Sequence, residues 1–205
     1  AKRKAEELKI NNIEFMQSDI LNLYNLKQKF DIVESVGVLH HMEDPLTGWK
    51  ILTDCLNEGG LMLIGLYSKN SRKHIAKIKR QIKESNIGSN DCDIRTFRSD
   101  LIKSEDPNHI KITSQSDFFS MSTLRDLLFQ VQEQQFSIPQ IIKALNKLNL
   151  SFCGFTLNNN NIAENFKALY PKKDDFYDLE KWETFEREHP ESFISMYQFW
   201  CQKLG

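Results

Sequence analysis

Short apolar stretches rich in β-branched residues alternate with helical patterns in the first third of the chain. Residues 13–17, 30–39 and 61–67 are strand-like, and the last two lack the strict alternation of a half-exposed strand. Such continuous apolar strands are typical of a parallel sheet covered on both faces. Residues 2–9 and 45–56 have helical composition or spacing. The order of elements therefore predicts an α/β fold with a Rossmann-like, doubly wound, mostly parallel sheet.

Capping signals mark the boundaries of two predicted helices. Asp44 is a preferred N-cap residue, and Pro45 behind it suits the first helical position. The glycines within residues 57–60 are expected to end that helix. Ser137 and Gln140 have the spacing of a capping box and predict the start of a later helix.

The pattern changes after the third strand, where we expect a helical lid or insertion at about 68–136 within a single domain, 1–205. Residues 71–85 form a basic helical pattern, and residues 122–134 form a helix with one apolar side. The stretch between them, 86–121, is polar and weakly patterned, which favours a functional loop or lid.

The remainder of the chain returns to alternating elements. A helix is predicted after Ser137, and residues 151–157 read as a strand. Two short helices are expected at 162–170 and 179–185, each followed by a proline. The aromatic-rich residues 195–202 favour a final strand.

Composition and charge exclude several classes of protein. The 205 residues are 40% hydrophobic with a net charge of −1, which fits a globular domain and argues against nucleic acid as a partner. No apolar run approaches the roughly 20 residues of a membrane helix, so no membrane association is expected. The cysteines are widely spaced, which argues against a metal site of zinc type and indicates a reducing, cytoplasmic setting.

A candidate ligand contact follows the first predicted strand. Ligands of open parallel sheets lie beyond the carboxyl ends of the strands. Asp19, which precedes Ile20, is therefore placed to accept hydrogen bonds from an adenine amino group or a ribose. The alternative is that Asp19 only caps the segment that follows.

A second candidate site lies at the end of the next strand, in residues 34–42. Gly37 would let a ligand approach the backbone closely, and His40 could act as a base near neutral pH. His40 and His41 cannot easily chelate one metal ion, because adjacent side chains of a strand point to opposite faces. The alternative is that one histidine packs and the other caps the next helix.

The expected insertion carries two sets of candidate substrate contacts. The basic helix 71–85 could meet phosphates, although such a face is more often simply solvated. Arg125 and Asp126 could orient a substrate beside a lid, but a helix with a buried side and exposed charges explains them as well.

Taken in order, these motifs resemble the class I S-adenosylmethionine-dependent methyltransferases. Residues 30–42 and 59–64, with the helix between them, look like the family's fourth strand, fourth helix and fifth strand. Residues 15–20 look like its third strand with an adenine-binding acid. Residues 151–157 and 195–203 look like its final hairpin, in which the last strand runs antiparallel.

More narrowly, three stretches are similar to methyltransferase domains that are often fused behind tetratricopeptide repeats. The resemblance therefore implies an N-terminal repeat domain as a candidate partner in the intact protein. The stretches are Gly37-Val38-Leu39-His40-His41-Met42, Arg125-Asp126-Leu127-Leu128-Phe129 and Met196-Tyr197-Gln198-Phe199-Trp200-Cys201-Gln202-Lys203.

The resemblance also implies a cofactor, S-adenosylmethionine, and a set of site residues. Those expected to line the cofactor, largely through the backbone, are Asp19, Ile20, Ser35, Val36 and Gly37. His40 would lie beside the reacting centre as a candidate catalytic base. Tyr67, Phe119 and Arg125 would contact the methyl acceptor, which the sequence does not identify.

One departure from the family concerns the start of the chain. Members carry a glycine-rich turn after their first strand and an acid after their second, and nothing here matches either. Residues 1–9 look like the helix after the second strand. We therefore expect a sheet that is incomplete at its N-terminal side, and weak or no cofactor binding by this portion alone. Two alternatives stay open, namely a non-catalytic remnant or interaction module and a nicotinamide-dependent dehydrogenase.

Overall fold

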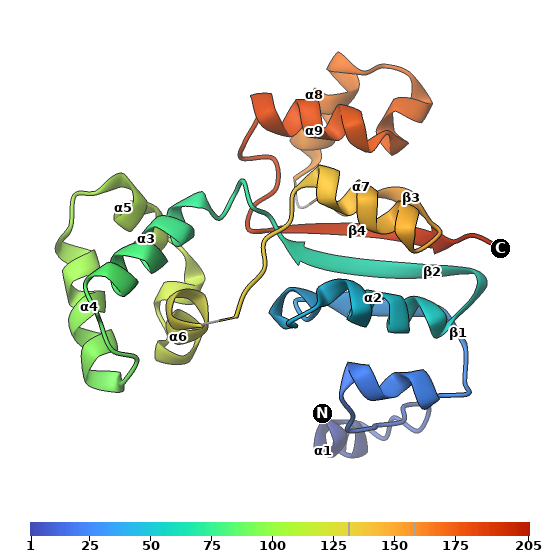
Figure 1. Ribbon diagram of the computed structural model, residues 1–205, viewed down its shortest axis with the longest axis horizontal. Helices are drawn as coiled ribbons and strands as arrows, with labels where there is room; N and C mark the ends of the chain where they lie inside the picture. Colours follow the sequence, from blue (N-terminus) through green and yellow to red (C-terminus); the bar gives the residue numbers. More distant parts are fainter. Residues whose placement is uncertain (131, 158) are drawn as a thin grey trace.

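A four-stranded mixed sheet forms the centre of the computed structural model, which describes residues 1–130, 132–157 and 159–205 (Figure 1). The strand order is β1-β2-β4-β3. β1 (Phe30–Val36) and β2 (Leu56–Tyr67) are parallel, whereas β4 (Met196–Lys203) runs antiparallel to β2 and to β3 (Leu150–Phe155). The predicted fold class, a mostly parallel sheet with an antiparallel C-terminal strand, is confirmed.

The parallel pair ends at one edge of the sheet, where Val36 is paired with Gly65. At its other end β2 begins earlier than predicted. Residues 57–60 belong to the strand, across from an irregularity in β1, and do not cap a helix. The preceding helix α2 (Pro45–Asp54) already ends at Asp54, with Cys55 as its C-cap, and β2 begins at the next residue.

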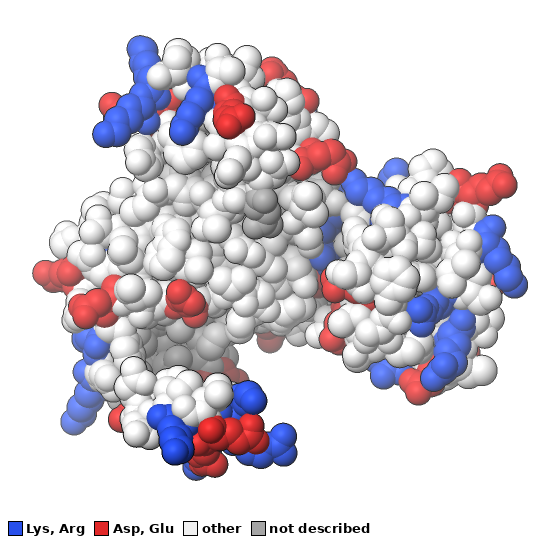
Figure 2. Space-filling model, turned by 180° about the vertical axis from the view of Figure 1, so that it is seen from behind, with Lys and Arg blue, Asp and Glu red and all other residues white. Residues whose placement is uncertain are grey.

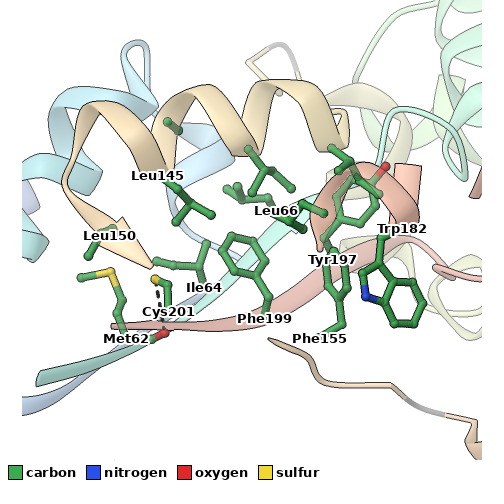
Figure 3. Close-up of a cluster of buried hydrophobic side chains, with 14 of the residues drawn as sticks. Met62, Ile64, Leu66, Leu145, Leu150, Phe155, Trp182, Tyr197, Phe199 and Cys201 are labelled. Atoms are coloured by element: carbon green, nitrogen blue, oxygen red, sulfur yellow. Dashed lines mark hydrogen bonds between the residues drawn. The ribbon is translucent and has the colours of Figure 1, made fainter. Parts of the chain in front are cut away.

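Helices cover one face of this sheet. Along β2 and β4 buried residues alternate with half-exposed ones, and the buried set meets α2 and α7 (Ile138–Lys147) (Figures 1 and 3). The other face keeps apolar side chains in contact with solvent, among them Ile32, which is 55% exposed, with Val36 and Leu61. The expectation that the strands are covered on both faces is therefore wrong for the described residues.

The first predicted strand, residues 13–17, is not a strand. These residues pair with no other described segment, and Phe15 and Met16 are largely exposed. A strand needs a hydrogen-bonding neighbour. β1 is an edge strand, and no described segment pairs with its outer side. Residues 13–17 instead lead from α1 (Lys2–Glu7) to the 3-10 helix η1 (Ile20–Asn25), which packs on α2.

The insertion predicted at about 68–136 is a cluster of helices with a hydrophobic core of its own (Figure 1). It consists of α3 (Lys73–Glu84), α4 (Asp91–Lys103), α5 (Pro107–Thr113), η3 (Ser116–Phe118) and α6 (Met121–Phe129). The expected polar loop 86–121 is thus helical. Its few apolar side chains are enough, because Ile94, Phe97 and Leu101 recur at helical spacing and are buried.

The C-terminal elements follow the predicted order. The capping box at Ser137 is present at the start of α7, and β3 and β4 form the hairpin partners. Between them lie α8 (Asn160–Leu169), η4 (Lys173–Tyr177) and α9 (Leu179–Glu188).

Two findings bear on the expected surroundings of the chain. No helix in the described ranges is long and apolar enough to cross a membrane. All cysteines are free thiols, with Cys55 and Cys201 buried, and burial raises the pKa of Cys201 to about 12. A thiol of this kind packs as an inert apolar group. The cytoplasmic setting stays a prediction.

Candidate active site

The turn after β1 brings its functional groups to the edge where the parallel strands end. Gly37 has a φ of +79°, and a Cβ placed on it would meet nothing within 4 Å. The backbone can therefore reverse here and leaves open space beside it. The 3-10 turn η2 (Leu39–His41) follows at once and places His40 inside the protein with no exposed surface.

His40 is stacked against Tyr67, the last residue of β2. Their ring centroids are 3.7 Å apart with an angle of 26° between the planes. The guanidinium carbon of Arg72 lies 3.6 Å from the same Tyr67 centroid. Two groups this close cannot share one face of a ring, so Tyr67 is held between His40 and Arg72.

His40 is a buried polar group without a well-formed hydrogen bond. Neither ring nitrogen has a partner of good geometry within the described residues, although the Gly65 backbone is close enough to raise the pKa of His40 slightly, and the buried hydroxyl of Ser35 also lacks a partner. Burial, with a smaller contribution from neighbouring His41, lowers the pKa of His40 to about 4. His40 is therefore neutral at pH 7. An unpaired buried donor or acceptor costs about 1–3 kcal/mol, so a ligand or water that bonded His40 would remove this cost.

The lowered pKa of His40 predicts a pH dependence of stability. The unfolded chain takes up this proton near pH 6.5, the folded chain only near pH 4. Stability is therefore complete above pH 6.5 and is lost as the pH falls from 6.5 to 4, by roughly 3 kcal/mol. Urea titrations across this range should show the loss, and the variant His40→Phe should show a flatter profile. His74, whose pKa burial also lowers, contributes in both proteins. Equal slopes would contradict the assignment.

A pocket of about 300 Å³ opens next to this stack, between the strand ends and the insertion. His41 and Tyr67 form the side that belongs to the sheet. The insertion supplies the remaining lining residues, which are Asp117, Thr123, Asp126, Leu127 and Gln130. The pocket thus joins an aromatic wall to two carboxylates. Thr123 donates a hydrogen bond to the backbone oxygen of Asp117 and not to its carboxylate.

The predicted acceptor contacts occupy different places. Tyr67 lines the pocket. Phe119 is 66% exposed, and its backbone oxygen accepts a hydrogen bond from Arg98. Arg125 points away from the pocket to an ion pair with Asp91 on α4. Of the two neighbours Arg125 and Asp126, only Asp126 lines the pocket.

The predicted cofactor contacts form two groups. Ser35, Val36 and Gly37 lie together at the end of β1, next to His40. Asp19 is the N-cap of η1, where its carboxylate accepts a hydrogen bond from the Leu21 backbone at 2.8 Å. Ile20 is half-buried against the core of the sheet. Asp19 therefore has the capping role that was the alternative interpretation of the sequence. The second oxygen of its carboxylate can still accept another hydrogen bond.

Sequence reasoning missed two residues at the base of the insertion. Arg72 is 2% exposed and makes two bonds to Glu133, whose side chain is 4% exposed. Although burial opposes it, Arg72 and Lys79 lower the pKa of Glu133, so that the pair is ionised. In the sequence Arg72 is one of many basic residues of 71–85, and no local signal sets it apart.

The strand order, the antiparallel last strand and the turn of Gly37 and His40 define a Rossmann-like methyltransferase fold. The profile of the family described as "Methyltransferase domain" matches residues 1–136. The chain therefore belongs to this family of methyltransferase domains, as the sequence predicted.

Solved structures and curated relatives agree with this placement. PKMT2 from Rickettsia typhi has a TM-score of 0.67 at 15% identity over 98% of this chain, and it was also solved in complex with AdoHcy, S-adenosylhomocysteine. An uncharacterised protein of Synechococcus sp. is 35% identical over 72 residues, 35% of this chain. The tRNA U34 carboxymethyltransferase of Helicobacter hepaticus is 34% identical over 62 residues, 29% of this chain. The predicted cofactor, S-adenosylmethionine, is consistent with these neighbours.

The matches cover only part of those proteins. This chain spans 40% of PKMT2, and the aligned segments span 17% and 20% of the two curated relatives. The comparisons therefore establish the family and the fold.

Proposed function

We propose that this chain forms the acceptor side of an S-adenosylmethionine-dependent methyltransferase. The observation that carries the proposal is the joint placement of Gly37, His40 and Tyr67. All three lie where the parallel strands end, and Tyr67 lines a pocket whose other side the insertion forms. Ligands of open α/β sheets bind at this edge.

The residues of the first turn suit the cofactor. Open space beside Gly37 admits a ligand against the backbone, and the Ser35 hydroxyl and the His40 ring are buried polar groups without a well-formed hydrogen bond. Ser35, Val36 and Gly37 would hold the cofactor, and Asp19 and Ile20 would meet its adenine. S-adenosylmethionine, when bound, supplies a methyl group already activated by a sulfonium centre.

The protein's own contribution is to align the acceptor and to exclude water. Burial raises the pKa of Tyr67, so its hydroxyl stays protonated and can donate a hydrogen bond in the pocket. His40 is fully buried and does not line the pocket, and its pKa of about 4 makes it a weak base at neutral pH, so the role proposed for it is to accept a hydrogen bond from a ligand at the end of β1. If His40→Ala leaves turnover unchanged, His40 has no such role.

The charge of the pocket bears on the acceptor. Asp117 and Asp126 lie in the lining, and Arg125 is turned away to Asp91. In the view of Figure 2 the insertion carries charges of both signs, interspersed, with no continuous basic surface. Phosphate binding needs clustered positive charge. We therefore propose a neutral or cationic acceptor and no nucleic acid, although one relative is named for a tRNA reaction.

The open side of the sheet supports the proposal that the site is completed from elsewhere. The edge of β1 is unpaired within the described residues, and Phe30, Ile32 and Val33 line an apolar groove with Met16. In the family that the sequence resembles, the first strand lies beside the fourth. We propose that an upstream part of the protein, which would include the glycine-rich turn, pairs with the free edge of β1 and covers the apolar groove. A repeat domain would lie further upstream.

The natural gene tests this proposal. A Gly-x-Gly turn within about 60 codons upstream of Ala1, and AdoHcy binding by the full natural protein, are expected for the enzyme. This 205-residue chain alone should bind AdoHcy weakly or not at all in a calorimetric titration. Micromolar binding by the chain alone would refute the need for upstream residues. A start codon near residue 1 together with no binding would favour the non-catalytic remnant.

Gly37 offers a sharper test of where the cofactor lies. Gly37→Val should weaken AdoHcy binding by the full natural protein at least about tenfold, because the side chain strains the turn and fills the open space. Gly59 is a matched control. It has a φ of +75° and equally open surroundings, but it lies at the opposite end of β2. Equal losses of binding in Gly37→Val and Gly59→Val would refute the placement of the cofactor.

A further inference from the structure

A buried ion pair joins the two chain segments that connect the insertion to the sheet. The outgoing segment, 68–72, contains Arg72, and the return segment, 132–136, contains Glu133. The Arg72 Nε and Nη2 atoms donate to the two carboxylate oxygens of Glu133 at 3.1 and 3.0 Å. Lys79 adds a bond to Glu133 of 2.8 Å, and Arg72 also donates to the Ser195 hydroxyl at 3.2 Å.

The return segment is also bonded to the turn that carries His40. The Gln134 backbone donates to the His40 carbonyl oxygen at 2.8 Å, and its side chain donates to the Glu43 carbonyl oxygen at 2.7 Å. The Phe136 backbone donates to the Tyr67 carbonyl oxygen at 2.8 Å. The base of the insertion is thus bonded to the same two strand ends that form the candidate active site.

Stability alone is a weak reason for such a pair. Desolvation of two buried charges offsets most of their attraction, and well-packed apolar residues of similar volume are often no less stable. A two-pronged arginine–carboxylate pair does fix the plane of the guanidinium. Here the guanidinium carbon lies 3.6 Å from the Tyr67 centroid, and the His40 ring centroid lies 3.7 Å from the same point.

We propose that Glu133 and Arg72 are positioning residues for methyl transfer. Glu133 holds Arg72 against the face of Tyr67, and Tyr67 in turn keeps His40 shielded from water. The functional meaning rests on the role proposed for His40 and the pocket. Neither Glu133 nor Arg72 lines the pocket, so both act through Tyr67.

The titration of His40, followed by NMR on histidine-labelled protein, tests this arrangement in the 205-residue chain. The charged or titratable groups near His40 are Tyr67, which stacks on it, and His41, Arg72 and Glu133. The Glu133 charge raises the pKa of His40, whereas burial lowers it more strongly. In Glu133→Gln the loss of the charge would lower the pKa of His40, whereas exposure of His40 to water would raise it. The direction of the change therefore separates a positioning role from a purely electrostatic one.

If Glu133 positions Tyr67, Glu133→Gln will let water reach His40, and its titration midpoint will rise by about one pH unit or more. Arg72→Lys, which keeps the charge but loses the planar two-bond contact, should act in the same direction. A midpoint that falls or stays unchanged in folded Glu133→Gln would overturn the proposal. If Glu133→Gln fails to fold, the same criterion applies to Arg72→Lys.

Glu186 provides the matched control. It is a buried carboxylate that bonds Ser68 and Asn70 of the outgoing segment, and Tyr197 of β4. Glu186→Gln should loosen the same segment and leave the His40 midpoint unchanged. An equal rise in Glu186→Gln would show that any destabilisation exposes His40, which would also overturn the proposal. The measurement needs no cofactor, so failure of the full protein to bind AdoHcy would refute the proposed function separately.

Discussion

Arg72→Met is expected to lower the free energy of unfolding by about 3 kcal/mol, toward the lower end of the range for breaking a buried ion pair. The substitution leaves Glu133 buried, and only Lys79, whose side chain is 21% exposed, remains to compensate its charge. It also removes the cation from the face of Tyr67. Equilibrium unfolding in urea at pH 7 measures the change.

The double variant Arg72→Met, Glu133→Leu separates the pair from its individual charges. Removing both charges leaves nothing ionised and unpaired in this buried place, so the double variant should be more stable than Arg72→Met alone. Glu133→Leu alone strands the Arg72 guanidinium and completes the cycle. If the two single losses simply add, then the charges do not interact and the stack on Tyr67 must be held by other contacts.

The contrast between Arg72 and its sequence neighbours shows why the sequence could not predict this feature. Arg72 and Lys73 belong to one basic stretch, yet Arg72 is almost fully buried and Lys73 is exposed. The difference comes from Glu133, which lies 61 residues further along the chain. Helical periodicity reports which side of a helix is apolar, and it carries no information on the partner of a buried charge.

The strands were predictable to different degrees for a related reason. β1, β2 and the final hairpin have apolar sequences that fit the observed pairing. Residues 13–17 have a similar sequence and form no strand. A strand depends on its neighbours as much as on its own residues, so composition alone could not distinguish these cases. The sequence predicted a change of pattern after β2, but the helices there are stabilised by contacts across 86–121, where apolar residues are sparse.

The candidate site also has a part that the sequence predicts and a part that it does not. His40 and Tyr67 come together because both follow parallel strands, and topology alone predicts that strand ends converge. The pocket side formed by the insertion depends on how its helices dock. That docking turns Arg125 toward Asp91 and brings Asp117 and Asp126 to the lining, and it is set by tertiary packing.

The aromatic cluster between α8, α9 and β3 holds the C-terminal helices on the sheet that supports this site (Figure 3). Trp182 of α9 is completely buried at its centre. Its ring stacks on Phe166 of α8 at 3.8 Å and meets Phe155 of β3 at 5.4 Å. Its indole N–H donates to the Phe176 carbonyl oxygen at 2.9 Å, so the polar atom is paired as well.

Trp182→Ala is therefore expected to lower the free energy of unfolding by about 3–5 kcal/mol, because it removes a large buried side chain and leaves a cavity with an unpaired carbonyl. Trp182→Phe keeps the stack on Phe166 and should lose distinctly less. Tyr177→Ala, which truncates a half-exposed aromatic of the adjoining turn, should change stability little. The three variants are compared by urea unfolding at pH 7. A loss in Trp182→Ala no larger than in Tyr177→Ala would mean that α8 and α9 are not packed on the sheet through this residue.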